Sequence, residues 1–181
     1  MEKTERLLEK LEKIFGISRI LKQRDDLYFV NVSEEKLVAV LTHLRDVENF
    51  THLVLMSNVD YIERGVFQLT YILHNYETHI DLAILVEIPR ENPVLDSIHH
   101  LWKQGWAYQR EIKEMYGVNF PNSPRVDEAF VLEGWEEIPP MRREFDTKAY
   151  SFISLFASDV SINFEIWSKS RSLLPLHNNG G

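Results

Sequence analysis

The sequence predicts an α+β fold in which an antiparallel sheet, a meander, has helices packed on one face. Three β-rich runs, Leu53–Ile62, Val66–His74 and His79–Ile88, follow one another with short turns between them. Short connections favour antiparallel pairing of consecutive strands. Two amphipathic segments precede the runs and can cover the sheet. The prediction also includes an extended C-terminal tail, because periodicity is lost after residue 117.

The first helix is predicted over residues 2–15, and Gly16 ends it. Its apolar stripe consists of Leu7, Leu8, Leu11, Ile14 and Phe15. Two short strands, Ile17–Leu21 and Leu27–Val32, should follow around a polar turn.

A second helix should begin after Ser33, a good N-cap residue, and continue to about Asp46. Its inward side chains are predicted to be Leu37, Val40, Leu41 and Leu44. The two helices together provide the cover that the inner face of the meander needs.

Residues 94–117 keep near-helical spacing of apolar side chains and are predicted to be helical, either continuously or with a break at Gly105. Residues 118–148 have almost no periodicity but contain Phe120, Phe130, Trp135 and Phe145. Such aromatic content argues against a solvated linker. This segment, the strap, is expected to lie over a partner.

The predicted organisation is an α+β domain over residues 1–117, followed over residues 118–181 by the partner-binding strap and a C-terminal tail. Within the tail, Val160, Ile162, Phe164 and Ile166 alternate with polar residues. That alternation predicts a half-buried strand. The strand would either add to a sheet edge of this chain or of a partner, or be disordered in the free chain.

Composition excludes several classes of protein. The chain has 181 residues, a formal net charge of −8 and no cysteine. An acidic surface disfavours nucleic-acid binding. Without cysteine the chain can form no disulfides, has no thiolate nucleophile and cannot ligate an iron–sulfur cluster through its own cysteines. No apolar stretch reaches the length of a membrane-spanning helix, and no signal peptide is evident. We therefore expect a cytosolic chain, or the cytosolic part of something larger.

No catalytic, cofactor-binding or metal-ligating residue is predicted. The seven histidines include the adjacent pair His99 and His100, whose side chains would diverge on a helix and could not easily chelate one ion. His74 and His79 flank a turn, but no carboxylate–histidine motif surrounds them. Phosphate-binding loops and nucleophile elbows are also missing from the sequence.

Two stretches are more informative. In Trp106–Phe120, Arg110 and Glu114 stand four residues apart with Glu111 beside them. Such a cluster is ordinarily a solvated helix face. The neighbouring aromatic residues favour a partly buried network or an interface instead. In Leu132–Phe145, a Trp, a Pro-Pro and an Arg-Arg provide the residue types that interface hot spots prefer.

Together these stretches resemble the 30 kDa subunit family of respiratory complex I. That family includes the equivalent subunit of membrane-bound, energy-converting nickel–iron hydrogenases and related ferredoxin-linked complexes. Its pattern is roughly Trp-x-Glu-Arg-Glu-x-x-Asp-Met-Phe-Gly-Ile-x-Phe, then His-Pro, and later Asp-Trp-x-Gly-x-Pro-Leu-Arg-Lys-Asp-Phe. The matching residues are Arg110, Glu111, Met115, Tyr116, Gly117 and Phe120, followed by Trp135, Pro140, Arg142, Arg143, Glu144 and Phe145.

The chain departs from this pattern at several positions. Gln109 replaces a first Glu, Glu114 replaces Asp, and Ser123-Pro124 replaces His-Pro. These departures point away from the NADH-linked enzymes and towards the hydrogenase-type or ferredoxin-linked complexes.

The resemblance implies a non-catalytic peripheral subunit of a membrane-bound redox complex that couples electron transfer to ion translocation. It would lie on the cytoplasmic side of the membrane, without nucleic acid and without a cofactor of its own. Its partners would be the catalytic large subunit and the small iron–sulfur subunit, which would hold the nickel–iron and iron–sulfur centres, with membrane subunits contacted indirectly. The expected partner-binding residues are Trp106, Arg110, Glu111, Glu114, Tyr116, Phe120, Trp135, Pro140, Arg142, Arg143 and Phe145.

Two alternatives come from other classes of protein. One is a soluble adaptor whose tail binds partners transiently. The other is a small soluble enzyme that uses the cluster of Arg110, Glu111 and Glu114.

Overall fold

The computed structural model describes residues 2–157. The chain divides into two compact units, Met1–Arg143 and Glu144–Gly181. The first unit contains every strand that the structure describes: β1 (Ser18–Arg24), β2 (Leu27–Asn31), β3 (His52–Tyr61), β4 (Val66–Asn75) and β5 (Ile80–Pro89). They form one sheet with the order β1-β2-β5-β4-β3. This confirms the predicted α+β class.

The meander of β3, β4 and β5 is confirmed, with antiparallel pairing throughout. The hairpin of β1 and β2 extends the same sheet by a pairing that the sequence did not predict. β2 lies parallel to β5, so that Tyr28 is beside Leu82 and Val30 is beside Ile84. The sheet is therefore mixed, with β1 and β3 at its two edges.

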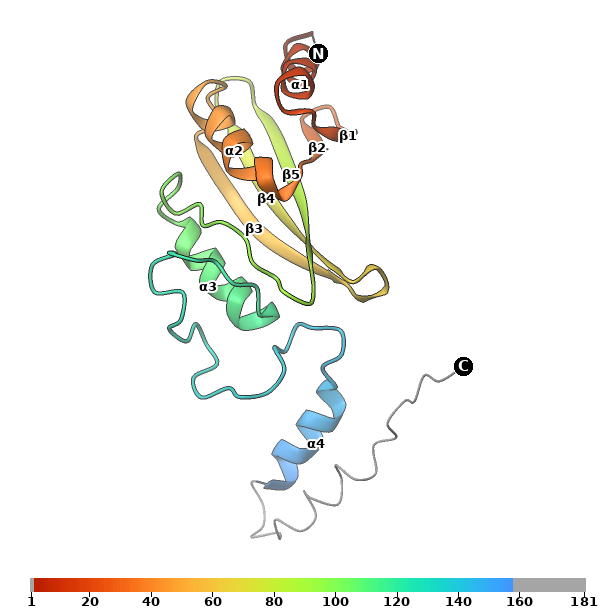
Figure 1. Cartoon of the computed structure of the whole chain (residues 1–181), viewed down its shortest axis with the longest axis vertical. Coiled ribbons are helices and arrows are strands. Elements are labelled where there is room, and N and C mark those ends of the chain that lie inside the picture. The colour runs from red at the N-terminus through yellow and green to blue at the C-terminus, as the bar shows by residue number, and fades with distance from the viewer. Residues whose placement is uncertain (1, 158–181) are drawn as a thin grey trace. The chain divides into compact units, whose positions relative to one another are not determined.

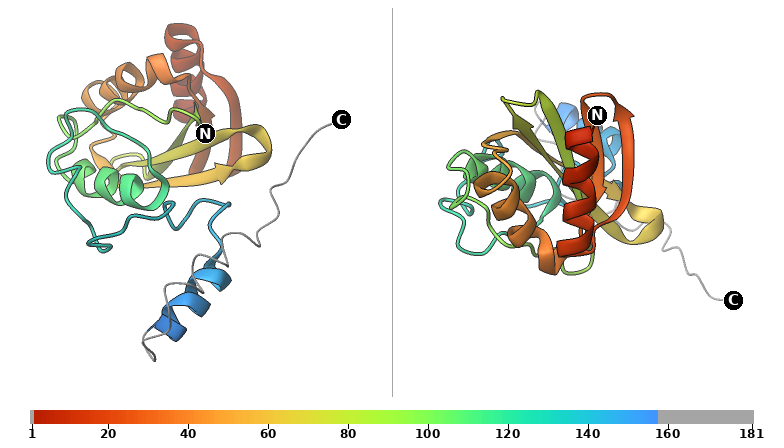
Figure 2. Two further views of the ribbon diagram at one scale, coloured as in Figure 1. Left: turned by 60° about the horizontal axis from the view of Figure 1, so that its bottom comes forward. Right: turned by 90° about the horizontal axis from the view of Figure 1, so that it is seen from above.

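One face of the sheet forms the core. Alternate residues of β4 are buried there (Phe67, Leu69, Tyr71 and Leu73). Helix α2 (Leu37–Asp46) buries all four predicted side chains, Leu37, Val40, Leu41 and Leu44. Figure 1 shows α2 lying across this face of the sheet. Helix α1 (Glu2–Phe15) contributes Leu8 and Leu11 to the same core and lies next to the β1–β2 hairpin (Figure 2).

The start of α2 differs in detail from the prediction. Ser33 precedes a short 3-10 turn, η1 (Glu34–Lys36), and its side chain does not cap that turn. The α-helix begins only at Leu37, where the buried side chains start.

The structure contradicts the predicted helix over residues 94–104, with or without a break at Gly105. Helix α3 runs from Gly105 to Tyr116. Before it, Val94 forms a bridge with Asn119, and Leu95 donates its backbone N–H to Asn119 at 2.9 Å. That pairing needs an extended backbone. The buried side chains of Ile98 and Trp102 are carried by turns that imitate helical spacing.

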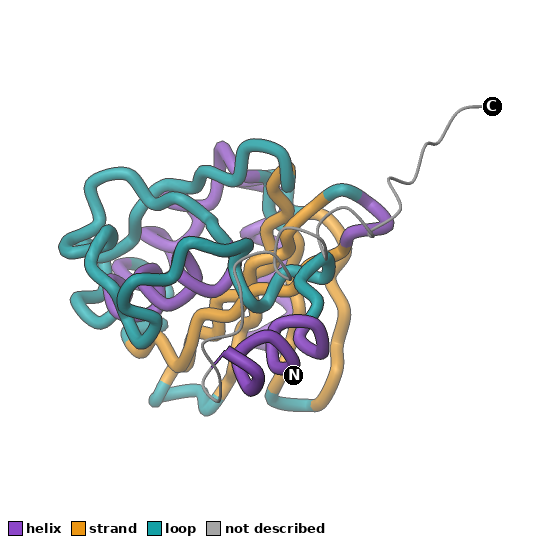
Figure 3. The backbone as a smooth tube through the Cα atoms, turned by 90° about the horizontal axis from the view of Figure 1, so that it is seen from below, coloured by secondary structure: helices purple, strands orange, loops and turns teal. Residues whose placement is uncertain are grey.

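The strap follows α3 as turns and loops, the kind of segment drawn in teal in Figure 3. It lies against α3, because Phe130 donates its backbone N–H to Glu114. In the second unit, Thr147–Ala157 form helix α4, where an extended tail was expected from the sequence. The carboxylate of Asp146 accepts the backbone N–H groups of Lys148 and Ala149, each at 3.0 Å, and so caps the helix. The predicted strand over residues 160–166 lies outside the described residues.

Candidate partner interface

Helix α3 ends at Gly117, where both the backbone conformation and the lack of space for a side chain favour glycine. Gly117 has φ +77°, in the left-handed region that glycine adopts without strain. A Cβ atom there would lie 2.9 Å from Nη2 of Arg142 and 3.3 Å from Cγ of Pro139. The two motif stretches found in the sequence are therefore in direct contact at this point.

Glu114 holds the strap against α3. Its carboxylate accepts the backbone N–H groups of Phe130 at 2.6 Å, Val131 at 2.9 Å and Leu132 at 3.2 Å. These are charge-assisted hydrogen bonds, and they satisfy three donors of a segment without regular structure. Glu114 is thus used on the strap rather than in the helical pair with Arg110 that the spacing suggested.

Arg110 lies between aromatic rings. Its guanidinium carbon is 5.2 Å from the ring centroids of Trp106 and of Phe130, within the range of cation–π attraction. Its Nη1 atom is 4.0 Å from a carboxylate oxygen of Glu128. The structure therefore supports the partly buried network over the solvated helix face.

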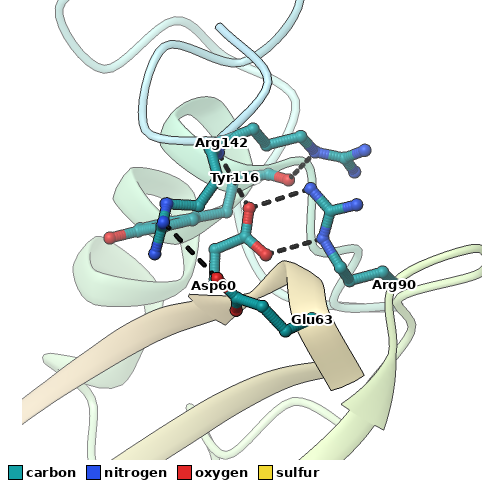
Figure 4. Close-up of polar contacts among 6 residues, drawn as sticks. Asp60, Glu63, Arg90, Tyr116 and Arg142 are labelled. Carbon is teal, nitrogen blue, oxygen red and sulfur yellow. Dashed lines mark hydrogen bonds and ion pairs between the residues drawn. The ribbon is translucent and has the colours of Figure 1, made fainter. Parts of the chain in front are cut away.

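A second cluster ties the end of the strap to the sheet (Figure 4). Asp60 of β3 lies on the core face, and Arg90 donates to it from Nε at 2.6 Å and from Nη2 at 2.8 Å. The backbone N–H of Arg143 donates to the same carboxylate at 2.9 Å. Arg142 donates from Nε to the carbonyl oxygen of Tyr116 at 2.7 Å.

The electrostatics of this cluster favour an ionised Asp60. Burial opposes ionisation, but hydrogen bonds from Arg90 and Arg143, with the charges of Arg90 and Arg142, outweigh it and hold the pKa of Asp60 below its usual range. The pKa of the Tyr116 phenol is raised, chiefly by burial and also by the negative charges of Asp60 and Glu111.

Sequence reasoning missed Asp60 and Arg90. In the sequence Asp60 alternates with Asn58 and so resembles part of a polar strand face. Only the register of β3 and β4 places Asp60 opposite the buried Phe67. A charged residue on the apolar face of a strand implies a buried partner.

The other predicted interface residues are distributed unevenly. Phe120 is fully buried in the core of the domain. Trp135 is partly exposed and donates from Nε1 to the carbonyl oxygens of Glu137 and Ile138. Phe145 belongs to the second unit, where its ring lies 5.6 Å from that of Tyr150. Glu111 and Arg143 have exposed side chains, and Pro140 is half-buried.

Two departures from the family pattern meet in one contact. Gln109 is fully buried in α3, and its Oε1 atom accepts the hydroxyl of Ser123 at 2.7 Å and that of Ser97 at 2.8 Å. Gln109 and Ser123 are two of the positions at which the sequence departs from the expected family pattern. The structure brings these two departures into direct contact.

Within residues 2–157 the structure shows no group of three His, Asp or Glu side chains placed to hold a metal ion. The same part of the chain has no helix that is both long and apolar enough to cross a membrane.

Comparison with known proteins identifies a family and several similar chains. Residues 30–151 match the family model described as the respiratory-chain NADH dehydrogenase, 30 Kd subunit. The C subunit of the F420H2 dehydrogenase of Methanosarcina mazei is 28% identical over 116 residues, which is 64% of this chain and 73% of that protein.

Two further relatives differ in how much they share. The C/D 2 subunit of the NADH-quinone oxidoreductase of Aquifex aeolicus is 30% identical over 125 residues, 68% of this chain but 21% of that longer protein. One polypeptide in the solved structure of the membrane-bound sulfane sulfur reductase, an archaeal respiratory membrane complex, superposes with a TM-score of 0.74. It is 20% identical, and the match covers 90% of this chain and 96% of that one.

Proposed function

Since the chain belongs to the 30 kDa subunit family of respiratory complex I, we propose that it supports assembly of a membrane-bound, hydrogenase-related complex by docking on its catalytic large subunit and its small iron–sulfur subunit. Membership makes it a non-catalytic subunit of a complex I-related respiratory complex. The docking surface and the type of complex are the parts that we propose.

One observation carries the proposal. The strap directs its backbone donors inward, to Glu114, and leaves apolar side chains outside. Val131, Ile138 and Met141 are all exposed. A loop that is held rigidly while it exposes apolar side chains has the properties of a preorganised interface. The cation–π contacts of Arg110 with Trp106 of α3 and Phe130 of the strap stabilise the same surface.

The large subunit is the favoured partner because of how relatives are built. In the C/D 2 protein of Aquifex aeolicus the part similar to this chain is one section of a longer polypeptide, named for both C and D. Two proteins that are fused in one organism commonly contact each other in another. We therefore assign the strap surface to the D-type large subunit.

The departures from the family pattern at Gln109 and Ser123, which are in contact, support a hydrogenase-type or ferredoxin-linked complex rather than an NADH-linked one. In such a complex the chain would be peripheral, on the cytoplasmic side, and the nickel–iron and iron–sulfur centres would belong to its partners. The complex would couple electron transfer to ion translocation.

Affinity purification of the tagged full chain from native membranes tests this function. We expect hydrogenase-like and iron–sulfur proteins to co-purify. Val131→Ser should reduce their yield several-fold, because Val131 is 65% exposed on the strap. Val47→Ser is the matched control, since Val47 is 59% exposed at the end of α2 and is not part of the strap.

Other outcomes would support the alternatives. A chain that purifies alone and catalyses a reaction would be an enzyme. Partners that are lost in moderate salt would indicate an adaptor. Equal yields for the two valine variants would remove the strap from the interface.

A further inference from the structure

A hollow of about 220 Å³ lies between α3 and the edge strand β3. Its lining includes Met56, Asn58, Glu111, Met115, Tyr116 and Met141. Met141 is an exposed strap residue, so the hollow is continuous with the docking surface proposed above. The inference that follows rests on that proposed function.

Asn58 is the unusual member of the lining. The residue is only 6% exposed, yet neither its amide nitrogen nor its amide oxygen has a hydrogen-bond partner among the described residues. A buried amide without partners is destabilising, and each native case calls for an explanation. Asn75, 3% exposed, shows the ordinary situation. It donates to the carbonyl of Glu48 and accepts two backbone N–H groups.

The walls of the hollow are mostly apolar, with Ser57, Asn58 and Glu111 as polar members. Three of the four methionines in the chain line it, each from a different segment. Methionine side chains are unbranched and polarizable, and they adjust to the shape of an inserted group. Glu111, which is exposed, adds a negative charge at the same site.

These groups define the chemistry of an occupant. Asn58 needs both a donor and an acceptor. A carboxylate offers only acceptors and would be repelled by Glu111, whereas a guanidinium offers only donors. Both amide atoms of Asn58 are covered in the free chain, so an occupant reaches them only by displacing the methionine side chains of the hollow. A primary carboxamide then offers an acceptor for the Asn58 amide nitrogen, a donor for its oxygen, and a second N–H for Glu111. We propose that the hollow receives a glutamine or asparagine side chain of the docked large subunit.

Paired leucine substitutions at the two buried asparagines test the role of Asn58. We expect Asn58→Leu to leave the melting temperature of the full chain unchanged or raised, because no hydrogen bond is lost. The affinity of this variant for the co-expressed large subunit should fall at least tenfold. Asn75→Leu should lower the melting temperature instead, while folded Asn75→Leu protein keeps its affinity for the large subunit.

The outcomes separate the two proposals. Wild-type chain that fails to bind the large subunit would overturn the proposed function and this inference together. Wild-type and Asn58→Leu chains that bind equally would overturn the inference alone. An Asn58→Leu chain that melts as early as Asn75→Leu and still binds normally would show Asn58 to be structural.

Photo-methionine identifies the occupant. When it replaces methionine in the protein, three of the four reactive groups line the hollow. After illumination of the assembled complex, we expect cross-links from positions 56, 115 and 141 to a large-subunit peptide, within two residues of a glutamine or asparagine. Cross-links to another subunit, or to a peptide without either amide residue, would overturn the assignment.

Discussion

Removal of the Asp60 carboxylate should destabilise the domain more than loss of any exposed ion pair. In Asp60→Ala the chain loses two hydrogen bonds from Arg90 and one from the backbone of Arg143. The exposed fractions of the two charged side chains are 1% for Asp60 and 15% for Arg90, so the guanidinium would remain largely buried after this carboxylate is lost.

The magnitude follows from this burial. Breaking a fully buried pair costs about 3–5 kcal/mol. Arg90 keeps its position 5.3 Å from the centroid of the Phe67 ring, and some water reaches it, so we expect a loss of about 3 kcal/mol. For a chain of this length that corresponds to a melting temperature lower by roughly 6–12 °C.

Urea unfolding of the full chain, followed by tryptophan fluorescence, measures the change. Glu63→Ala is the matched control from the same cluster. Its carboxylate lies 3.5 Å from Nη2 of Arg143, and both side chains are mostly exposed. A pair of that kind contributes under about 1 kcal/mol. If Asp60→Ala and Glu63→Ala were equally stable, the buried contacts of Asp60 with Arg90 and Arg143 would not stabilise the domain more than an exposed ion pair does.

The pH dependence provides an independent check. Because the pKa of Asp60 is lowered in the folded state, its contribution is complete above the unfolded value of about 3.9 and is lost as the pH falls through the folded value. The difference in unfolding free energy between wild type and Asp60→Asn should therefore be largest near neutral pH and shrink below about pH 4. A difference that stays constant on acidification would contradict the assignment.

Three further changes probe the contacts between α3 and the strap. Glu114→Gln should weaken the attachment of the strap to α3 by about 1–2 kcal/mol, which would appear as faster hydrogen exchange at the backbone N–H of Val131. Unchanged exchange would show that the Glu114 carboxylate does not hold the strap. Gln109→Glu should destabilise the chain by about 3 kcal/mol because it buries a carboxylate, and adding Ser123→His should recover at least about 1 kcal/mol; strictly additive unfolding free energies would show that the two sites are independent. Gly117→Ala should lower the free energy of unfolding by at least about 1–2 kcal/mol from the positive φ alone, which thermal melting measures. An unchanged melting temperature would mean that Pro139 and the C-terminal end of α3 move freely to accept the new side chain.

The spacing of apolar residues within one segment predicted the features of the fold that depend on that segment alone. The spacing of Leu37, Val40, Leu41 and Leu44 predicted which side chains α2 buries. The parallel pairing of β2 with β5 could not be predicted in this way, because the choice of neighbour depends on residues more than 50 positions apart in the chain. Helical spacing also misled at Trp102, since a series of turns can present apolar residues at similar intervals.

In the candidate site too, the sequence revealed the residues of one segment but not their long-range contacts. The aromatic and charged residues of Trp106–Tyr116 were recognised from composition and spacing. The partners of Glu114 lie 16 to 18 residues further along the chain and are backbone N–H groups, which have no sequence signature. The Gln109–Ser123 contact appeared in the sequence only as two separate departures from a pattern.

The distance in sequence between Asp60 and Arg143 has a consequence for how the chain is made. The two residues are 83 positions apart, whereas Arg90 directly follows β5. On the ribosome, Asp60 can pair with Arg90 as soon as the sheet has been synthesised. Arg143 follows roughly 3–10 s later at ordinary elongation rates.

The nascent protein therefore passes through a stage in which the sheet is complete and the strap has not yet been synthesised. Its hollow beside Asn58 then lacks the wall that Met141 provides. A partner that recognises the strap meets a domain that has already folded. The direction of translation thus imposes an order on assembly, with the sheet first, α3 next and the docking surface last.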